Sequence, residues 1–249
     1  MKTYYFKALP LVAVVAMSCQ SVHASTFSLG AAALGSTNLY KGYGNNFYPI
    51  PVVDYDGDNF YFHSLVAGYY LWKDQQNQLS LIAGYNPFGF RPKDTDDEQL
   101  KRLDKRRGTL MAGVAYNHNA EWGTIRTTFT GDTLDYSNGL VGDVAYLYAF
   151  KADKWAVVPG VGVMWNSANQ NKYYYGVSGN ESRRSGLQSY KPGDSFNPYF
   201  ELSAKYSFAP QWQAFFTGRY IRLADEVKDS PMVDKSYTGV VMTGITYSF

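Results

Sequence analysis

The chain has 249 residues, of which 17% are aromatic, and its formal net charge is only +2. That charge is carried by Lys2 and Lys7 near the start of the chain, so the remainder lacks the basic surplus of a nucleic-acid-binding protein. The mean hydropathy of -0.32 is low for a membrane protein, but a membrane β-barrel needs no continuous apolar segment, because only alternate residues of each strand face lipid. The 23 tyrosines fit the aromatic girdles of such a barrel. A soluble aromatic-rich sandwich or lectin-like domain is the alternative.

The first segment, residues 1–24, has the pattern of a secretory signal peptide. Two lysines precede an apolar run from Ala8 to Cys19, which is shorter than the roughly 20 apolar residues that a membrane-spanning helix needs. Small residues frame a cleavage point between Ala24 and Ser25. We therefore expect the mature protein to comprise residues 25–249.

Cys19 allows a second interpretation, that of a lipoprotein precursor. The usual leucine three residues before a lipidated cysteine is replaced by Ala16, which disfavours this interpretation. Because Cys19 is the one cysteine of the chain, cleavage after Ala24 leaves none in the mature protein. A disulfide framework and a thiolate metal site are then excluded.

The mature chain contains segments in which apolar and polar residues alternate, separated by turn residues and without a helical stripe or a domain linker. Such alternation is typical of β-strands with one apolar face. A proline lies inside one face, at Pro159, where its missing N–H predicts a bulge or local irregularity. The clearest apolar faces span Phe27–Ala33, Leu79–Tyr85, Leu110–Tyr116, Trp155–Trp165, Phe200–Phe208 and Trp212–Tyr220.

Connection lengths predict a transmembrane barrel with short periplasmic turns and long outer loops. Counting back from the C-terminus, four short connections alternate with four longer ones before the pattern becomes irregular near Asp56–Asp58. A barrel with both ends in the periplasm needs an even number of strands. Splitting Asn59–Lys73 into two short strands that reverse near His63–Ala67 gives twelve strands, which we prefer. Ten strands remain the alternative, if one N-terminal strand does not span.

The last strand, Tyr237–Phe249, alternates apolar residues with threonine and serine up to the final carboxylate. Terminal residues of soluble domains tend to fray, whereas a closed barrel pairs its last strand with its first. Ile245, Tyr247 and the terminal Phe249 resemble the signal by which the insertion machinery recognises bacterial outer-membrane barrels. Outer-membrane lipid is then the immediate surroundings of the chain.

A narrow barrel leaves little open lumen, since interior width grows with strand number. If the apolar faces point to lipid, a set of charged residues of both signs points inward. Charges of opposite sign in a confined lumen are expected to pair, and the pairing fixes the strand register; a small polar conduit or ligand site is the alternative. The predicted network comprises Arg126, Asp143, Glu201, Lys205 and Arg219.

Catalysis is not expected, although several small outer-membrane barrels are enzymes. The mature chain offers His63 and His118 as bases, and the neighbouring Ser64 points to the opposite face of a strand from His63. No cofactor or metal is expected either. Acidic residues at Asp94–Glu98 are interleaved with basic ones, which favours solvation, salt bridges or divalent-cation contact with lipopolysaccharide.

Three long segments are distinctive: Thr127–Gly139, Asn169–Leu187 and Arg222–Ser236. Together with Tyr69–Trp72 and Leu103–Arg106 they resemble the MipA/OmpV family of outer-membrane proteins. The resemblance implies a non-enzymatic scaffold of murein turnover that holds a lytic transglycosylase and a bifunctional penicillin-binding murein synthase together. All three segments fall on the expected outer side, whereas murein lies in the periplasm, so they are either lids over the lumen or remote from the partners. A small porin or a surface adhesin is the alternative function.

Overall fold

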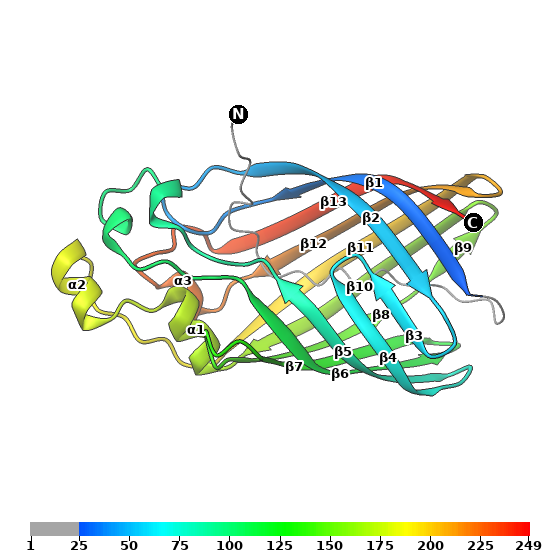
Figure 1. Ribbon diagram of the computed structural model, residues 1–249, viewed down its shortest axis with the longest axis horizontal. Helices are drawn as coiled ribbons and strands as arrows, with labels where there is room; N and C mark the ends of the chain where they lie inside the picture. The colour runs from blue at the N-terminus through cyan, green and yellow to red at the C-terminus, as the bar shows by residue number, and fades with distance from the viewer. Residues whose placement is uncertain (1–24) are drawn as a thin grey trace.

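The alternation seen in the sequence produces an antiparallel sheet that closes on itself (Figure 1). The computed structural model describes residues 25–249, so Ala24 and the rest of the expected signal peptide lie outside the described residues. The strands are β1 (Thr26–Ser36), β2 (Asn46–Asp56), β3 (Phe60–His63), β4 (Val66–Lys73), β5 (Asn77–Asn86), β6 (Thr109–Ala120), β7 (Gly123–Asp132), β8 (Leu140–Leu147), β9 (Phe150–Ala152), β10 (Trp155–Asn166), β11 (Ser195–Ala209), β12 (Trp212–Arg222) and β13 (Tyr237–Ser248).

Twelve strands make up the wall, as preferred from the sequence, because β8 and β9 are two parts of one strand that both pair with β10. The break between them lies opposite Pro159, which confirms the predicted irregularity. Tyr148 N–H donates to the Pro159 carbonyl (3.1 Å), but proline has no N–H to return the bond. The predicted reversal within Asn59–Lys73 is also confirmed, since β3 and β4 form a short hairpin that turns at Ser64 and Leu65.

Closure joins the two ends of the sequence. β13 pairs with β1 in a register that sets Tyr247 opposite Leu29 and Ile245 opposite Ala31. The Phe249 N–H donates to the Phe27 carbonyl (3.0 Å), and the two rings stack with centroids 5.5 Å apart. No helix within residues 25–249 is both long enough and apolar enough to cross a bilayer.

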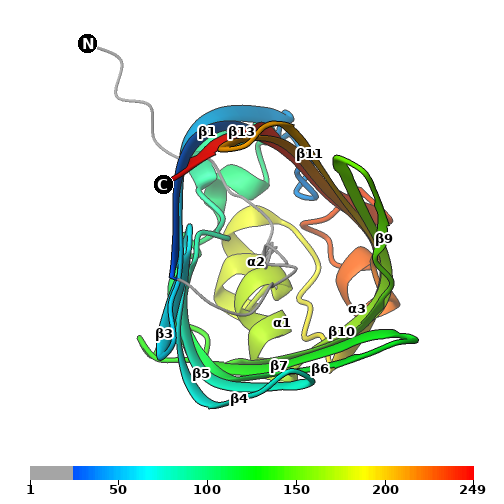
Figure 2. The ribbon, with the colours of Figure 1, turned by 90° about the vertical axis from the view of Figure 1, so that its right-hand side faces the viewer.

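The two ends of the barrel differ. At the end that holds the C-terminus, strands are joined by turns of two or three residues, which face the periplasm (Figure 1). The opposite, outer end carries the long loops, which contain α1 (Ala168–Tyr175), α2 (Gly179–Ser185), α3 (Asp225–Lys228) and two short 3₁₀ helices, η1 (Pro92–Asp94) and η2 (Leu100–Arg102). Viewed along the barrel, α1 and α2 lie across its outline (Figure 2).

Candidate functional site

Four inward-pointing charged residues meet in the lumen, one from each of four strands. Glu201 on β11 accepts hydrogen bonds from Arg126 on β7 at both carboxylate oxygens (2.9 Å each) and from Arg219 on β12 (2.6 Å). Asp143 on β8 lies farther from both guanidinium groups, at 3.8 Å, and accepts a hydrogen bond from the Tyr199 hydroxyl (2.8 Å). The structure therefore brings four of the five predicted network residues together.

This lumen network is balanced and buried. It contains two cations and two anions, and each of the four residues is less than a tenth exposed. A buried ion pair is retained at low cost only when its remaining hydrogen-bonding groups are also satisfied. Tyr199 and the bidentate Arg126–Glu201 contact supply most of those bonds, while Asp143 Oδ2 accepts no hydrogen bond from the residues that the structure describes and faces Arg219 at 3.8 Å. Because Arg126 lies on β7 and Glu201 on β11, the network also ties two non-neighbouring parts of the wall together across the lumen.

The fifth predicted residue, Lys205, is half-buried and points inward from β11, four residues nearer the short-turn end than Glu201. The predicted insertion signal lies on the outer surface of the barrel. Ile245 is 47% exposed and Phe249 is 73% exposed, while the Tyr247 ring contacts both Phe249 and Trp212. Ser25, on the mature side of the expected cleavage point, is exposed.

The outer loops pack into an apolar cap over the mouth of the barrel. Side chains from four different loops form one buried cluster, in which Phe90, Leu100 and Met232 are wholly buried. Two of the three distinctive segments, Asn169–Leu187 and Arg222–Ser236, contribute to it. A cavity of about 30 Å³ lies beneath the cap, lined in part by Leu39, Tyr174 and Asn197, which is room for one or two water molecules.

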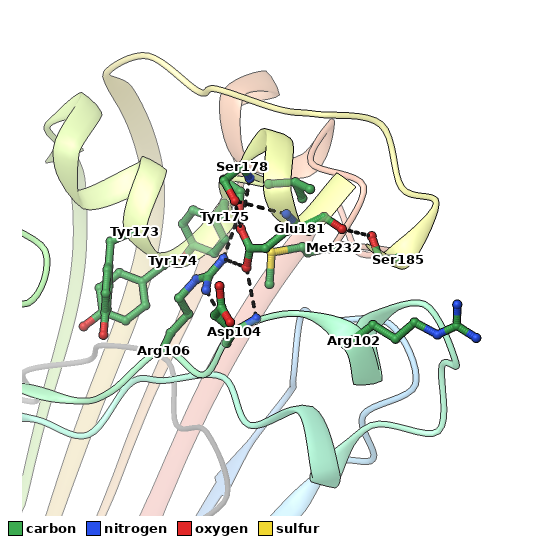
Figure 3. A network of polar contacts seen from close by, with 12 residues as sticks. Arg102, Asp104, Arg106, Tyr173, Tyr174, Tyr175, Ser178, Glu181, Ser185 and Met232 are labelled. Atoms are coloured by element: carbon green, nitrogen blue, oxygen red, sulfur yellow. Dashed lines mark hydrogen bonds and ion pairs between the residues drawn. The ribbon is translucent and has the colours of Figure 1, made fainter. Parts of the chain in front are cut away.

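A second ion pair, outside the lumen, fastens α2 to the loop that follows β5 (Figure 3). Arg106 Nη2 lies 2.7 Å from Glu181 Oε1, and Glu181 also accepts hydrogen bonds from the backbone N–H groups of Asp104 (3.0 Å) and Ser178 (2.9 Å). Burial alone would raise the pKa of Glu181, but the Ser178 hydrogen bond and the Arg106 charge together hold that pKa below its usual range. The residue stays ionised inside the cap at neutral pH.

A polar cluster that the sequence reasoning missed lies along the β3–β4 hairpin, from His63 beside the turn to Lys73 at the base. His63 points into the lumen between Asp54 (3.7 Å) and Asp56 (4.0 Å), and Asp56 also binds Lys73 (3.1 Å). Ser64 lies in the hairpin turn with a positive φ of 54°. The signal was present in the sequence, because Asp54 and Asp56 are two residues apart and therefore share a face of β2.

The second candidate base, His118, is placed near the short-turn end of β6. Its Nδ1 lies 3.0 Å from Asn77 Oδ1, and its ring is 6.0 Å from that of Trp122. Within residues 25–249, no group of three or more His, Cys, Asp or Glu side chains is arranged to hold a metal ion.

Comparisons with known proteins give a consistent result. The sequence profile of the family described as MltA-interacting protein MipA matches residues 29–249. The MltA-interacting protein of Escherichia coli (strain K12) is 52% identical over 98% of each chain, and an E. coli (strain K12) outer membrane protein, YiaT, is 38% identical over 97% of this chain and 96% of its own. Among solved structures, the outer-membrane-expressed OmpT of Vibrio cholerae covers 92% of this chain and 99% of its own, at 8% identity and a TM-score of 0.39.

Proposed function

The chain belongs to the MltA-interacting protein MipA family, and from this premise we propose that it is a non-enzymatic outer-membrane scaffold of murein turnover. The partners in this proposal are a lytic transglycosylase and a bifunctional penicillin-binding murein synthase. The observation that carries it is the 52% identity, over nearly the whole chain, to a protein whose name states an interaction with MltA.

The obstructed lumen favours the scaffold function over that of a small porin. The buried network of Arg126, Asp143, Glu201 and Arg219 and the packed outer cap both lie across the path that a solute would take through the barrel.

The short-turn end is the proposed docking surface, because murein enzymes work in the periplasm. Its turns are rigid: the Asp74 carboxylate, for example, accepts hydrogen bonds from the backbone N–H groups of Gln76 (2.8 Å) and Asn77 (2.7 Å). A surface that is ordered before binding loses less conformational entropy on association. Lys151 on β9 and Lys154 in the β9–β10 turn are both exposed and provide accessible charges at this end.

The test is retention of a purified lytic transglycosylase on an affinity column that carries the folded barrel. We expect retention at moderate salt by the unaltered chain, loss of retention by Lys151→Glu/Lys154→Glu, and no change with Arg183→Glu/Lys191→Glu. The control pair changes the charge by the same amount at exposed positions of the cap end. If the unaltered chain retains no enzyme, the scaffold function is wrong; if the cap variant alone loses retention, the docking end is wrong.

The synthase is tested on the same column. A column loaded first with the transglycosylase is expected to retain the penicillin-binding synthase together with it. If the bound transglycosylase prevents the column from retaining the synthase, or the reverse, a scaffold that holds both enzymes is contradicted.

A further inference from the structure

One part of the barrel wall is left without a neighbouring strand. β2 pairs with β1 along its whole length, from Asn46 to Asp56, but it pairs with β3 only over Asp54–Asp56. Toward the outer end, no ladder joins β2 to β4 or β5 within the described sheet. Figure 1 faces this flank and shows the short β3–β4 hairpin between β2 and β5. Residues 47–52 of β2 therefore form an open edge.

The opening is framed on every side, so we call it the β2 window. At its base, the hairpin tip is attached to both flanking strands: Ser64 N–H donates to the Val53 carbonyl (2.9 Å), and Tyr85 N–H on β5 donates to the tip (3.1 Å). At the outer end, the loop before β2 meets the loop after β5, where the Tyr40 and Phe88 rings stack at 5.7 Å. The window is a bounded gap in an otherwise closed sheet.

Two prolines occupy the positions at which an open edge is most costly. The Val53 carbonyl faces the hairpin. Backbone N–H and C=O groups alternate sides along a strand, so the backbone groups of Pro51, Pro49 and Phe47 also point toward the window. An unpaired N–H in hydrocarbon costs several kcal/mol, but a proline has no N–H. The edge therefore carries few unsatisfied donors, and it is a poor template for a further strand.

The window lies at the depth of the lipid hydrocarbon. The register sets Pro51 opposite Ala31, which in turn lies opposite Ile245, a residue that is 47% exposed on the outer face of β13. Phe47 at the rim is 76% exposed. The rim is thus continuous with the apolar belt that faces the bilayer.

On the β1 side of the window the inward side chains are apolar, whereas the polar cluster of His63, Asp54 and Asp56 lies at the hairpin below the window and the charged network lies on the opposite wall. Inward positions on the three adjoining strands carry Leu34 on β1, Ile50 and Val52 on β2, and Met242 on β13. A largely apolar concave surface is the usual character of a site that binds an apolar ligand.

From these observations we propose that the β2 window is a lipid-binding site, in which one acyl chain of an outer-membrane lipid enters between β2 and β5 and lies against the apolar side of the lumen. The hydrocarbon outside, the lack of edge donors and the apolar interior all match a hydrocarbon chain. Two other occupants of the window fit less well. Water would leave the apolar side chains exposed to solvent. A strand from a second copy of the chain would need N–H donors on β2 at the positions where β2 has prolines. The proposal does not depend on the scaffold function.

The test uses a fluorescent reporter at matched positions. The mature chain has no cysteine, so Tyr48→Cys and Met242→Cys each create a single labelling site. Both residues point inward, and both lie opposite Leu34, one on each side of β1, so they occupy matched positions in the strand register. Phe47→Cys is the lipid-facing reference. Each variant is labelled with an environment-sensitive fluorophore and folded into phosphatidylcholine vesicles, with and without chain-doxyl phosphatidylcholine as the quencher.

We expect the doxyl chain to quench the reporter at position 48 to an extent comparable with position 47, while position 242 keeps its fluorescence. Equal quenching at 48 and 242 would overturn the proposal, as would quenching of position 48 by aqueous iodide but not by the doxyl chain, which would mean a water-filled window. Dimers cross-linked through position 47 would instead assign the window to a second copy. If Tyr48→Cys fails to fold, Ile50→Cys reports from the same inward face.

Discussion

Replacing Glu201 with glutamine tests whether the lumen network stabilises the barrel. The substitution keeps the shape of the side chain but removes the charge that binds Arg126 and Arg219, and the remaining carboxylate, on Asp143, lies 3.8 Å from each of them. Removing one partner of a buried ion pair costs about 3–5 kcal/mol, because the opposite charge is left uncompensated. We expect Glu201→Gln to lower the free energy of unfolding by an amount in this range.

Asp143 provides an internal comparison. It makes no ion pair shorter than 3.8 Å in the network and contributes a single short hydrogen bond, from Tyr199. Asp143→Asn should therefore cost less, about 1–3 kcal/mol, because a neutral amide oxygen replaces the charged acceptor of that hydrogen bond. Glu121→Gln, in an exposed periplasmic turn, should change stability by no more than about 0.5 kcal/mol.

The assay is reversible urea unfolding in phospholipid vesicles, followed by tryptophan fluorescence. A second variant, Arg126→Gln/Glu201→Gln, restores the charge balance and should cost less than the sum of the two single changes. The reasoning is refuted if Glu201→Gln is as stable as Glu121→Gln, or if Asp143→Asn is the more destabilised of the two network variants.

Two further predictions concern the cap and the packing of the lumen. The pKa of Glu181 is lowered below its ordinary value of 4.5 in the folded cap, so its stabilising contribution is complete at neutral pH and is lost as the pH falls from 4.5 through the lowered pKa. The protection factor of the Asp104 amide, which donates to Glu181, should fall over that pH range, after correction for the intrinsic exchange rate at each pH. An unchanged protection factor there would contradict the assignment. A methyl group on Gly162 would overlap the Tyr199 ring and the Val144 carbonyl, so Gly162→Ala should destabilise the barrel by about 1–3 kcal/mol in the same urea assay. Gly44→Ala, with open space around it, is the control, and equal stability of the two variants would show that the lumen is not closely packed.

The strand pattern could be predicted because side chains alternate strictly along a strand. Alternation identified the lipid-facing residues and indicated that Arg126, Asp143, Glu201 and Arg219 point inward. Connection lengths favoured twelve strands over ten, and the missing N–H of Pro159 indicated the irregularity. Alternation could not show which of the four charged residues meet. Arg126 and Glu201 are 75 positions apart, and their contact depends on the relative shift of strands around the closed sheet.

The cap and the window were beyond the reach of the sequence for a different reason. Loop segments have no periodicity, so nothing indicated that Arg106 would pair with Glu181 rather than face solvent with its basic neighbours. Pro49 and Pro51 mark an edge position, but their meaning depends on knowing that β3 and β4 are too short to cover β2.

The most direct test of the account is site-specific photo-cross-linking in intact cells. A photoreactive residue at Lys154, in the periplasmic β9–β10 turn, should yield a covalent adduct with the lytic transglycosylase, whereas the same residue at Asn180, on the outer cap, should yield none. Adducts at position 180, or no adduct at position 154 when both proteins are present, would contradict a scaffold that presents its short-turn end to the murein machinery.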